Sequence, residues 1–571
     1  MKRLQYFAML CVFVTLFAGS AWGAVAKIGS TEYENLSALA TAIGGTLTDK
    51  TIRLSDDKTL GGTLIISTDT ELSLDLNGKT LSLAGQVIHN RGKLTIIDTT
   101  GNGKVVSSTD CAIGTLDNST LILGSKENSS YNNFSVEAQE AAILTGKSKN
   151  ATIYVYGGTY TTKDNAVFMT NGSTGYHGHK WYIYDGTFNG NITTEGYVAC
   201  GIYAPNSDDW YVYGGTFNIT KGTGILARAG TVHIPEDSKV VINTTGNVTG
   251  KVGDSRVVVP CAPIVFDTSA GYPGLTDDSK IIIGGGTFSS EVDNISFVSK
   301  DNDVIANRFN VTGGNFTSDP TSYLASESYK SVQIGEHYYV VSSTATVSAD
   351  LTATSIDYGK TLADSTISGT IKIGDVVIDS SDYTLAWASP DTVPTVAGGE
   401  QRYEVTVSPA INGTSSFTVK ITVNKVDSSV TTAPTAVASL VANGTAQALI
   451  TAGTAENGEM QYALGSDDQT APTTGYSTTI PTGIDAGEYY VWYKVVGDAN
   501  HNDTTPVCIT VTIKEAETET PGTSTTKTLS SFDVTISGDT ALTATYGTSA
   551  TKTFTASVKA GYSDGTTSAL T

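Results

Sequence analysis

Basic residues are scarce in this chain of 571 residues, where 34 Lys and Arg stand against 56 Asp and Glu for a formal net charge of −22. Such an acidic surface repels phosphate backbones, which excludes nucleic acid as a partner. Charged residues amount to only 16% of the chain, and long stretches with helical spacing are also scarce. Abundant Gly, Ser, Thr, Asn and Asp instead predict an all-β protein with many turns.

Cysteines are few and far apart in the sequence. Cys11 lies in an N-terminal apolar run, and the others are Cys111, Cys200, Cys261 and Cys508. No Cys-x-x-Cys or Cys/His ligand spacing occurs, which excludes a structural zinc site. A fold that depends on disulfides would use more cysteines. One disulfide within the solenoid stays open, and the sequence does not assign its cysteines. No motif in the sequence specifies a metal or a cofactor, so none is expected. Calcium binding stays open, without a motif that supports it.

Long apolar runs are absent beyond the N-terminus, so we expect no transmembrane segment apart from the signal peptide. The chain begins with a basic Met-Lys-Arg, followed by an apolar run from Leu4 to about Ala18 and then small residues. This pattern predicts a secretory signal peptide over residues 1–23, cleaved after Gly23. We therefore expect the protein to be secreted or located on the extracellular cell surface.

A short phrase recurs five times along the chain. The full copies read Tyr-Val-Tyr-Gly-Gly-Thr-Tyr (154–160), Tyr-Ile-Tyr-Asp-Gly-Thr-Phe (182–188) and Tyr-Val-Tyr-Gly-Gly-Thr-Phe (211–217). Two reduced copies, residues 283–288 and 311–316, lack the tyrosine pair. The steps between the final aromatic residues are 28, 29, 71 and 28 residues. A fixed period in this range predicts stacked structural repeats.

The residues of the phrase fall into two groups. Tyr-Val-Tyr is a strand pattern, in which side chains alternate between two faces. The middle residue is aliphatic in every copy and is expected to face the core, so the flanking tyrosines face outward in two columns, one coil above the next: Tyr154, Tyr156, Tyr182, Tyr184, Tyr211 and Tyr213. The final aromatic residues are expected to form an internal stack: Tyr160, Phe188, Phe217, Phe288 and Phe316.

The period and the turn signals predict several domains. The expected order is a signal peptide (1–23), a parallel β-helix (24–343), two immunoglobulin-like β-sandwiches (344–426 and 427–514), an acidic linker (515–527) and a third, incomplete immunoglobulin-like module (528–571). A short helix over residues 33–40 is expected to cap the N-terminal end of the solenoid. The 71-residue step is expected to hold a degenerate coil at 240–242 and an excursion over 254–273. The last module has too few strands to close, so we expect the chain to be cut short.

Two segments resemble known families. Residues 74–98, with Leu-Asp-Leu-Asn-Gly-Lys-Thr-Leu and Gly-Lys-Leu-Thr-Ile-Ile-Asp, together with the Gly-Gly-Thr-Phe coils, resemble secreted bacterial right-handed parallel β-helix proteins of pectate-lyase-like architecture. Residues 443–502, with Tyr-Val-Trp-Tyr-Lys-Val-Val-Gly-Asp-Ala-Asn-His-Asn, are similar to bacterial immunoglobulin-like repeats found in tandem on large surface proteins. These resemblances cover nearly all of the mature chain and imply a cell-surface protein. They say little about activity, because β-helices serve lyases, hydrolases, adhesins and passive stalks.

Catalytic motifs of pectate-lyase-like enzymes are not found. Hydrolases of this architecture use a carboxylate pair, and the lyases add calcium and a basic residue. The polygalacturonase-like Asn-Thr-Asp and Arg-Ile-Lys motifs are absent. The weak catalytic candidates are His177 and His179, which lie just before a tyrosine strand, and Asp185, which is expected near them, and the three would form a catalytic or metal corner. The alternative is an exposed loop that enters this strand.

The outward tyrosines are the candidate ligand-binding residues. Pyranose C–H faces pack on aromatic rings while sugar hydroxyls bond to phenol groups, which suits neutral sugars. The alternative is a structural ladder, because cross-strand aromatic pairs stabilise a sheet by ~0.2–1 kcal/mol each. We expect an adhesion or recognition protein whose β-helix head binds a polysaccharide, a host or cell-surface glycan, or a protein, with immunoglobulin-like spacers. The rivals are a polysaccharide lyase or glycoside hydrolase, and a passive surface stalk.

Overall fold

The computed structural model describes residues 26–28, 31–33, 51–192, 194–253, 258–269, 271–299, 304–396, 401–517, 529–537, 555–562 and 567–570. The predicted signal peptide lies outside these residues, as do most of the predicted helix at 33–40 and most of the predicted linker. The chain divides into two compact units, residues 1–424 and 425–571, and its described part is all-β.

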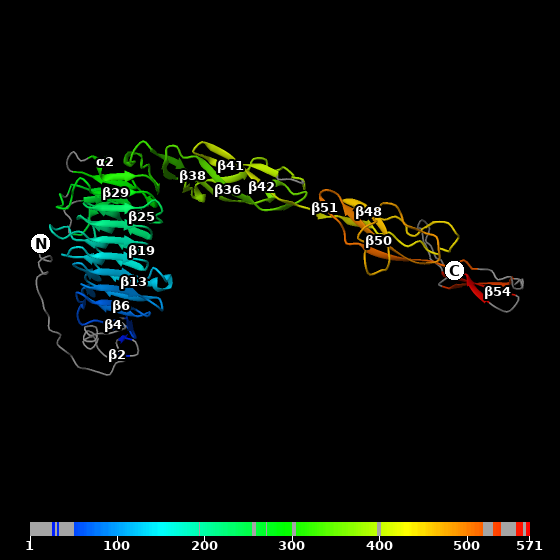
Figure 1. Ribbon diagram of the computed structural model, residues 1–571, viewed down its shortest axis with the longest axis horizontal. Helices are drawn as coiled ribbons and strands as arrows, with labels where there is room; N and C mark the ends of the chain where they lie inside the picture. Colours follow the sequence, from blue (N-terminus) through cyan, green and yellow to red (C-terminus); the bar gives the residue numbers. More distant parts are fainter. Residues whose placement is uncertain are drawn as a thin grey trace, which may run out of the picture. The chain divides into compact units, whose positions relative to one another are not determined.

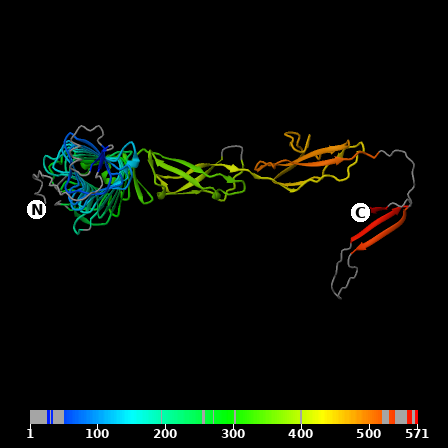
Figure 2. The ribbon, with the colours of Figure 1, turned by 90° about the horizontal axis from the view of Figure 1, so that it is seen from below.

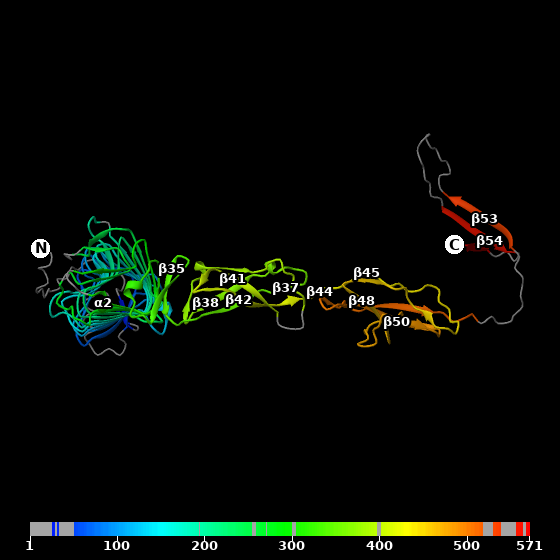
Figure 3. The same ribbon diagram turned by 90° about the horizontal axis from the view of Figure 1, so that it is seen from above.

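Residues 51–316 build a solenoid-like stack of three parallel sheets (Figure 1). Successive strands of a coil enter sheets A, B and C in turn, so the coils stack strand upon strand. Figures 2 and 3 look along this stack, where the coils lie over one another. Neighbouring coils pair in parallel and in register, an arrangement compatible with the predicted β-helix.

Sheet A carries the Tyr-Val-Tyr strands. In spatial order it consists of β2 (Thr31–Tyr33), β1 (Ala26–Ile28), β3 (Thr51–Leu54), β6 (Glu71–Asp75), β9 (Lys93–Ile97), β12 (Thr120–Leu123), β15 (Thr152–Val155), β18 (Lys180–Ile183), β21 (Asp209–Val212), β24 (Thr231–Ile234), β29 (Lys280–Ile283) and β32 (Phe309–Val311). β1 and β2 form an antiparallel hairpin that pairs with β3. Tyr33, which was expected to begin a helix, instead ends β2.

Sheet B follows the Gly-Gly turn of each phrase, and sheet C closes the coil. Sheet B consists of β34 (Tyr329–Ile334), β35 (His337–Ser342), β33 (Asn315–Phe316), β30 (Thr287–Ser290), β25 (Val241–Thr245), β22 (Thr216–Thr220), β19 (Thr187–Asn191), β16 (Thr159–Thr162), β13 (Phe134–Ala138), β10 (Gly103–Ser107), β7 (Thr80–Leu83) and β4 (Lys58–Thr59). Sheet C consists of β31 (Ile295–Val298), β28 (Ile264–Asp267), β23 (Gly222–Ala227), β20 (Ala199–Ala204), β17 (Ala166–Thr170), β14 (Ala141–Thr145), β11 (Ile113–Thr115), β8 (Ile88–Asn90) and β5 (Leu64–Ile66). The antiparallel hairpin β34–β35 pairs with β33, so antiparallel hairpins cover an edge at each end of the stack.

The inner residues of the repeated phrase form the core, as predicted. The middle aliphatic residues are fully buried: Val155, Ile183, Val212, Ile283 and Val311. The final aromatic residues are fully buried as well: Tyr160, Phe188, Phe217, Phe288 and Phe316. Their rings stack between coils, with centroid distances of 4.4 Å for Phe188–Phe217 and 4.8 Å for Phe288–Phe316. Ile242 takes this position in the coil between Phe217 and Phe288, so the aromatic stack is interrupted there.

The glycine directly before the Thr or Asn of each phrase is required by the turn from sheet A to sheet B. Its φ angle is positive in every copy, for example +139° at Gly186 and +94° at Gly215. A Cβ atom at Gly215 would also lie 2.6 Å from the ring of Phe188. Only glycine adopts this backbone conformation freely and leaves this space, so the turn and the inner aromatic stack depend on each other.

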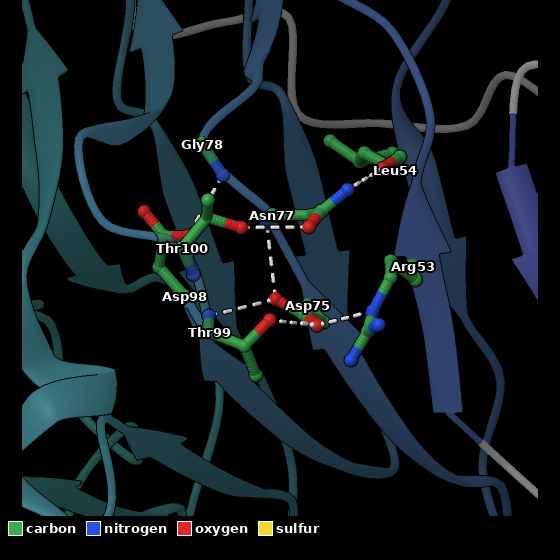
Figure 4. Close-up of polar contacts among 8 residues, drawn as sticks. All are labelled: Arg53, Leu54, Asp75, Asn77, Gly78, Asp98, Thr99 and Thr100. Atoms are coloured by element: carbon green, nitrogen blue, oxygen red, sulfur yellow. Dashed lines mark hydrogen bonds and ion pairs between the residues drawn. The ribbon is translucent and has the colours of Figure 1, made fainter.

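Aspartates hold the same turn in the earlier coils (Figure 4). The buried Asp75 carboxylate accepts hydrogen bonds from Arg53 Nε at 2.7 Å and from the Thr99 backbone N–H at 3.0 Å. Asp98, one coil later, accepts one from the Gly78 backbone N–H at 2.8 Å. Each carboxylate therefore joins neighbouring coils through charge-assisted hydrogen bonds, which are stronger than neutral ones.

The 71-residue step from Phe217 to Phe288 holds one further coil and an insertion that covers sheet C. The predicted degenerate coil is confirmed, because β25 pairs in register with β22 and β30. An antiparallel hairpin of β26 (Thr249–Lys251) and β27 (Val258–Pro260) follows, and it packs apolar residues onto the outer face of sheet C. β20 and β23 are buried along their whole length for this reason. Residues 254–257 and 270, within the predicted excursion, lie outside the described residues.

The rest of the first unit is a module of small, mainly antiparallel sheets. Its strands are β36 (Val347–Ala353), β37 (Ile356–Asp357), β38 (Ile367–Ile373), β39 (Val376–Val377), β40 (Thr384–Trp387), β41 (Gln401–Ile411), β42 (Thr414–Ile421) and β43 (Val423–Asn424). The hairpin β34–β35 contributes Ile334, Tyr339 and Val341 to the same buried cluster as Ile371 of this module. The solenoid and the module therefore share core residues.

The second unit is also built of small, mainly antiparallel sheets. Its strands are β44 (Val426–Asp427), β45 (Ser429–Thr432), β46 (Gln447–Ala448), β47 (Thr454–Glu456), β48 (Gly458–Gly465), β49 (Thr482–Gly483), β50 (Gly487–Gly497), β51 (His501–Asn502), β52 (Val507–Ile513), β53 (Leu529–Ser537), β54 (Thr555–Tyr562) and β55 (Thr567–Leu570). β48, β50 and β52 form one antiparallel sheet, and β53, β54 and β55 form another.

Candidate functional site

The six outward tyrosines lie on three consecutive strands of sheet A and directly after them. Their neighbours along the chain, such as Trp181, Ile183 and Trp210, are fully buried in the solenoid. Strand alternation therefore sends the tyrosines to the outer face of the sheet, where each is half-buried. We call this surface the tyrosine face, and it consists of Tyr154, Tyr156, Tyr182, Tyr184, Tyr211 and Tyr213.

The tyrosine rings form two stacked columns. In the first column the ring centroids lie 5.0 Å apart for Tyr154–Tyr182 and 5.1 Å apart for Tyr182–Tyr211, with nearly parallel planes. In the second column, Tyr156–Tyr184 and Tyr184–Tyr213 are both 4.9 Å apart. The parallel register of the sheet fixes these spacings, since each ring stands on the strand next to its neighbour's strand.

Stacking changes what the tyrosine face offers a ligand. A middle ring such as Tyr184 has a neighbouring ring on both sides, so its π faces are largely covered. Sugars were expected to pack on open ring faces, whereas the stacked rings present edges and hydroxyl groups to solvent. Among the described residues, none of the six hydroxyls has a protein hydrogen-bond partner. The face is therefore a grid of free phenol groups.

Three of these hydroxyls stay protonated at neutral pH. Partial burial, with smaller contributions from neighbouring tyrosines, Glu127 and Asp209, raises the pKa of Tyr156, Tyr184 and Tyr211 above the usual value for tyrosine. A protonated phenol can both donate and accept a hydrogen bond. The grid can therefore pair with ligand hydroxyls in either sense.

His233 extends the first column by one coil, and the sequence analysis missed it. Its ring stacks on Tyr211 at a centroid distance of 4.8 Å and an interplanar angle of 8°. The signal was present in Thr231-Val232-His233-Ile234, which keeps the alternation of the tyrosine strands with histidine in the first tyrosine position. Trp181 and Trp210 were also missed, and they stack at 4.4 Å in the core directly behind the tyrosines.

The weak catalytic candidates do not come together. His177 is exposed before β18, and Asp185 is exposed in the turn after the same strand, where it accepts a hydrogen bond from the Gly186 backbone N–H. A strand advances about 3.3 Å per residue, so the two side chains stand at opposite ends of β18. His179 is fully buried and its Nδ1 accepts a hydrogen bond from the Ala151 backbone N–H.

His179 is instead joined to the buried Asp208 through its backbone N–H. The backbone N–H of His179 donates to Asp208 Oδ1 at 2.9 Å, and both side chains are buried. Burial lowers the pKa of His179 to about 4 and raises the pKa of Asp208 to about 6. Both shifts have the same main cause, which is that the charged form loses its hydration inside the solenoid.

These two shifts act on stability in opposite directions. For His179, the unfolded chain binds more protons between pH 4 and 6.5, so this residue makes the fold more stable as pH rises. For Asp208, the folded chain binds more protons between pH 4 and 6, so this residue makes the fold less stable as pH rises. Each effect is worth roughly 3 kcal/mol across its window, and the two largely cancel in the native protein.

Single substitutions are expected to unmask each effect. The free energy of unfolding of Asp208→Asn should rise by roughly 3 kcal/mol between pH 4 and 6.5, because only the histidine effect remains. That of His179→Asn should fall by a similar amount between pH 4 and 6. Urea unfolding followed by tryptophan fluorescence at several pH values measures both. His177→Asn, at the exposed histidine, is the control, and profiles that parallel the native protein in all three variants would contradict the prediction.

One further side-chain group within the described residues has metal-ligand character. Asp110, Cys111 and Glu140 place one ligand atom each within 4.8 Å of one another. Burial and the two carboxylates raise the pKa of the Cys111 thiol well above its usual value, so the thiolate that metals bind is disfavoured. Calcium takes six to eight oxygen ligands, and this group supplies only two carboxylates.

The four cysteines Cys111, Cys200, Cys261 and Cys508 are all free thiols. The disulfide that the sequence left open therefore does not form among them. Within the described residues, no helix is both long and apolar enough to cross a membrane.

Comparison of the chain with protein-family models, with curated proteins and with solved structures found no match. The functional assignment therefore depends on the geometry of the tyrosine face.

Proposed function

We propose that the tyrosine face binds a neutral polysaccharide or glycan and that the protein is a secreted recognition or adhesion protein. One observation carries the proposal: six tyrosines whose hydroxyls have no protein partner stand in two columns on one sheet face, with ring centroids 4.9–5.1 Å apart. A regular grid of donors and acceptors suits a ligand that repeats its own hydroxyl groups at regular intervals. The net charge of −22 disfavours an anionic ligand.

The remainder of the chain supports a presenting role. The signal pattern of residues 1–23 supports secretion, and we propose that the solenoid is a right-handed parallel β-helix. We also propose that the modules at 344–426 and 427–514 are immunoglobulin-like spacers. Tyr489 supports this assignment, because its hydroxyl donates to the Asp485 backbone carbonyl at 2.8 Å, a contact of the kind that the tyrosine corner of such folds makes.

The test removes hydroxyls and leaves the rings in place. The double variant Tyr182→Phe/Tyr211→Phe is expected to bind its glycan roughly 30-fold more weakly, because two lost hydrogen bonds of about 1 kcal/mol each amount to about 2 kcal/mol. A glycan array identifies the ligand, and isothermal titration calorimetry then compares the affinities. The phenylalanine rings keep their stacking, so the thermal unfolding midpoint should not change.

Tyr197→Phe is the matched control, because Tyr197 is exposed on the solenoid but lies outside the tyrosine face. Its affinity should equal that of the native protein. If the double variant also keeps native affinity, the hydroxyl grid does not bind the glycan. The tyrosines would then form a structural ladder only.

A further inference from the structure

A hollow of ≈ 370 Å³ lies where the tyrosine columns begin. Its lining includes the apolar Ile97 and Ile122, the polar Glu127 and Tyr131, and Tyr156 at the start of the second column. Pockets of a few hundred Å³ with mostly apolar walls and a few polar groups are typical of small-ligand sites. We call this hollow the Tyr156 pocket.

The pocket exists because a glycine interrupts the second column. Leu123 pairs with Val155, so Gly124 stands next to Tyr156 on the preceding coil. Gly124 has no side chain to cover the ring, whereas Tyr184 covers the other side at 4.9 Å. Tyr156 therefore has a ring of its own column on one side only, and it lines the pocket together with Gly124.

The polar wall of the pocket is held in place by its own hydrogen bonds. Asn132 Oδ1 accepts from the Ser125 backbone N–H at 2.6 Å, and Asn132 Nδ2 donates to the Tyr156 backbone carbonyl at 2.9 Å. Asn128 accepts from the Ser130 backbone N–H at 3.1 Å and caps the short turn η1 (Ser129–Asn132). The loop that carries Glu127 is thus tied to the strand that carries Tyr156, so a ligand does not need to order it.

We propose that the Tyr156 pocket seats one pyranose unit of the glycan, an inference that rests on the proposed function of the tyrosine face. The C–H face of the sugar packs on the open side of Tyr156 and on Ile122, where no polar group needs a partner. The sugar hydroxyls bond to the Glu127 carboxylate and the Lys126 ammonium at the rim. The rest of the glycan continues along the two columns and pairs with their hydroxyls.

The test fills the pocket without changing any tyrosine. Thr95 lines the pocket and faces outward from β9. Thr95→Phe is expected to weaken binding at least tenfold, and Glu127→Gln severalfold. The probes are cello-, malto-, manno- and xylohexaose with their monosaccharides, measured by isothermal titration calorimetry. Ser73→Phe is the matched control, because Ser73 pairs with Thr95 one coil farther from the columns and should leave binding unchanged.

The outcomes separate the pocket from the tyrosine face. Native affinity in both Thr95→Phe and Glu127→Gln, with weaker binding in Tyr182→Phe/Tyr211→Phe, would overturn the pocket and leave the face. Weaker binding in the pocket variants alone would support the pocket and refute the hydroxyl grid. If the native protein binds none of the hexasaccharides, both proposals are overturned for neutral glycans. Circular dichroism of each variant confirms that it is folded.

Discussion

Replacing Arg228 with methionine is expected to lower the free energy of unfolding by about 3–5 kcal/mol. Arg228 is fully buried under the insertion on sheet C, where its Nε lies 2.8 Å from Asp267 Oδ2. Its Nη1 donates to the hydroxyls of Tyr203 at 3.0 Å and Tyr272 at 3.1 Å. Methionine fills much of the volume but leaves the Asp267 carboxylate buried without its counter-charge.

A double variant separates the charge from the packing. Arg228→Met/Asp267→Asn removes both charges, so it is expected to recover a large part of the lost stability. Urea unfolding of both variants and of the native protein gives the comparison. A double variant that is less stable than Arg228→Met would show that the unpaired Asp267 carboxylate is not the main cost of the substitution.

The second large effect is expected from Phe188→Ala, at a cost of about 3–5 kcal/mol. Phe188 is fully buried, and its ring stacks on Phe217 at 4.4 Å and meets Phe168 edge-on at 5.1 Å. The stack above and below is held by the coil register, so the cavity cannot collapse by a shift of one side chain. Thermal and urea unfolding measure the loss.

Tyr182→Ala is the matched control for Phe188→Ala. Tyr182 lies on β18, one turn before Phe188 on β19, but it faces outward. Its removal costs two ring contacts on the sheet surface, worth ~0.2–1 kcal/mol each. Similar losses in both variants would contradict the division of the phrase into inner and outer residues.

Much of the solenoid was predictable because its pattern is local. The alternation in Tyr-Val-Tyr assigns each residue to a face, and the 28-residue step places equivalent residues on neighbouring coils. The core positions of Val155 and Phe188 and the two tyrosine columns follow from these two facts. The degenerate coil expected at 240–242 is present, but only the structure shows that Ile242 takes the position of the final aromatic residue.

Of the residues 33–40, where a helix was expected, only Tyr33 lies within the described part of the chain, and it ends β2. β2 pairs with β1 in an antiparallel hairpin, and β1 in turn pairs with the edge strand β3 of the stack. Strand pairing therefore overrides the local helix preference at Tyr33.

Contacts between residues of the candidate site were harder to predict from the sequence than the strands that carry them. His177 and Asp185 are eight residues apart, and only the extended strand between them shows that they cannot meet. Arg228 in the apolar stretch Gly-Ile-Leu-Ala-Arg-Ala-Gly was a signal of a buried charge, yet its partner Asp267 is 39 residues away. Such pairs form between coils and insertions, where the sequence has no fixed period.

The stacking of coils and the outward tyrosines on three of them follow from the order of the residues alone. What those tyrosines offer to a ligand depends on how the coils pack on one another. Ring stacking across the coils covers the middle rings. Gly124 stands next to Tyr156 on the preceding coil and has no ring, and both residues line the pocket together with Glu127. The alternation that turns a side chain inward or outward is a property of each strand by itself, whereas the side chains that cover a ring come from the neighbouring coils.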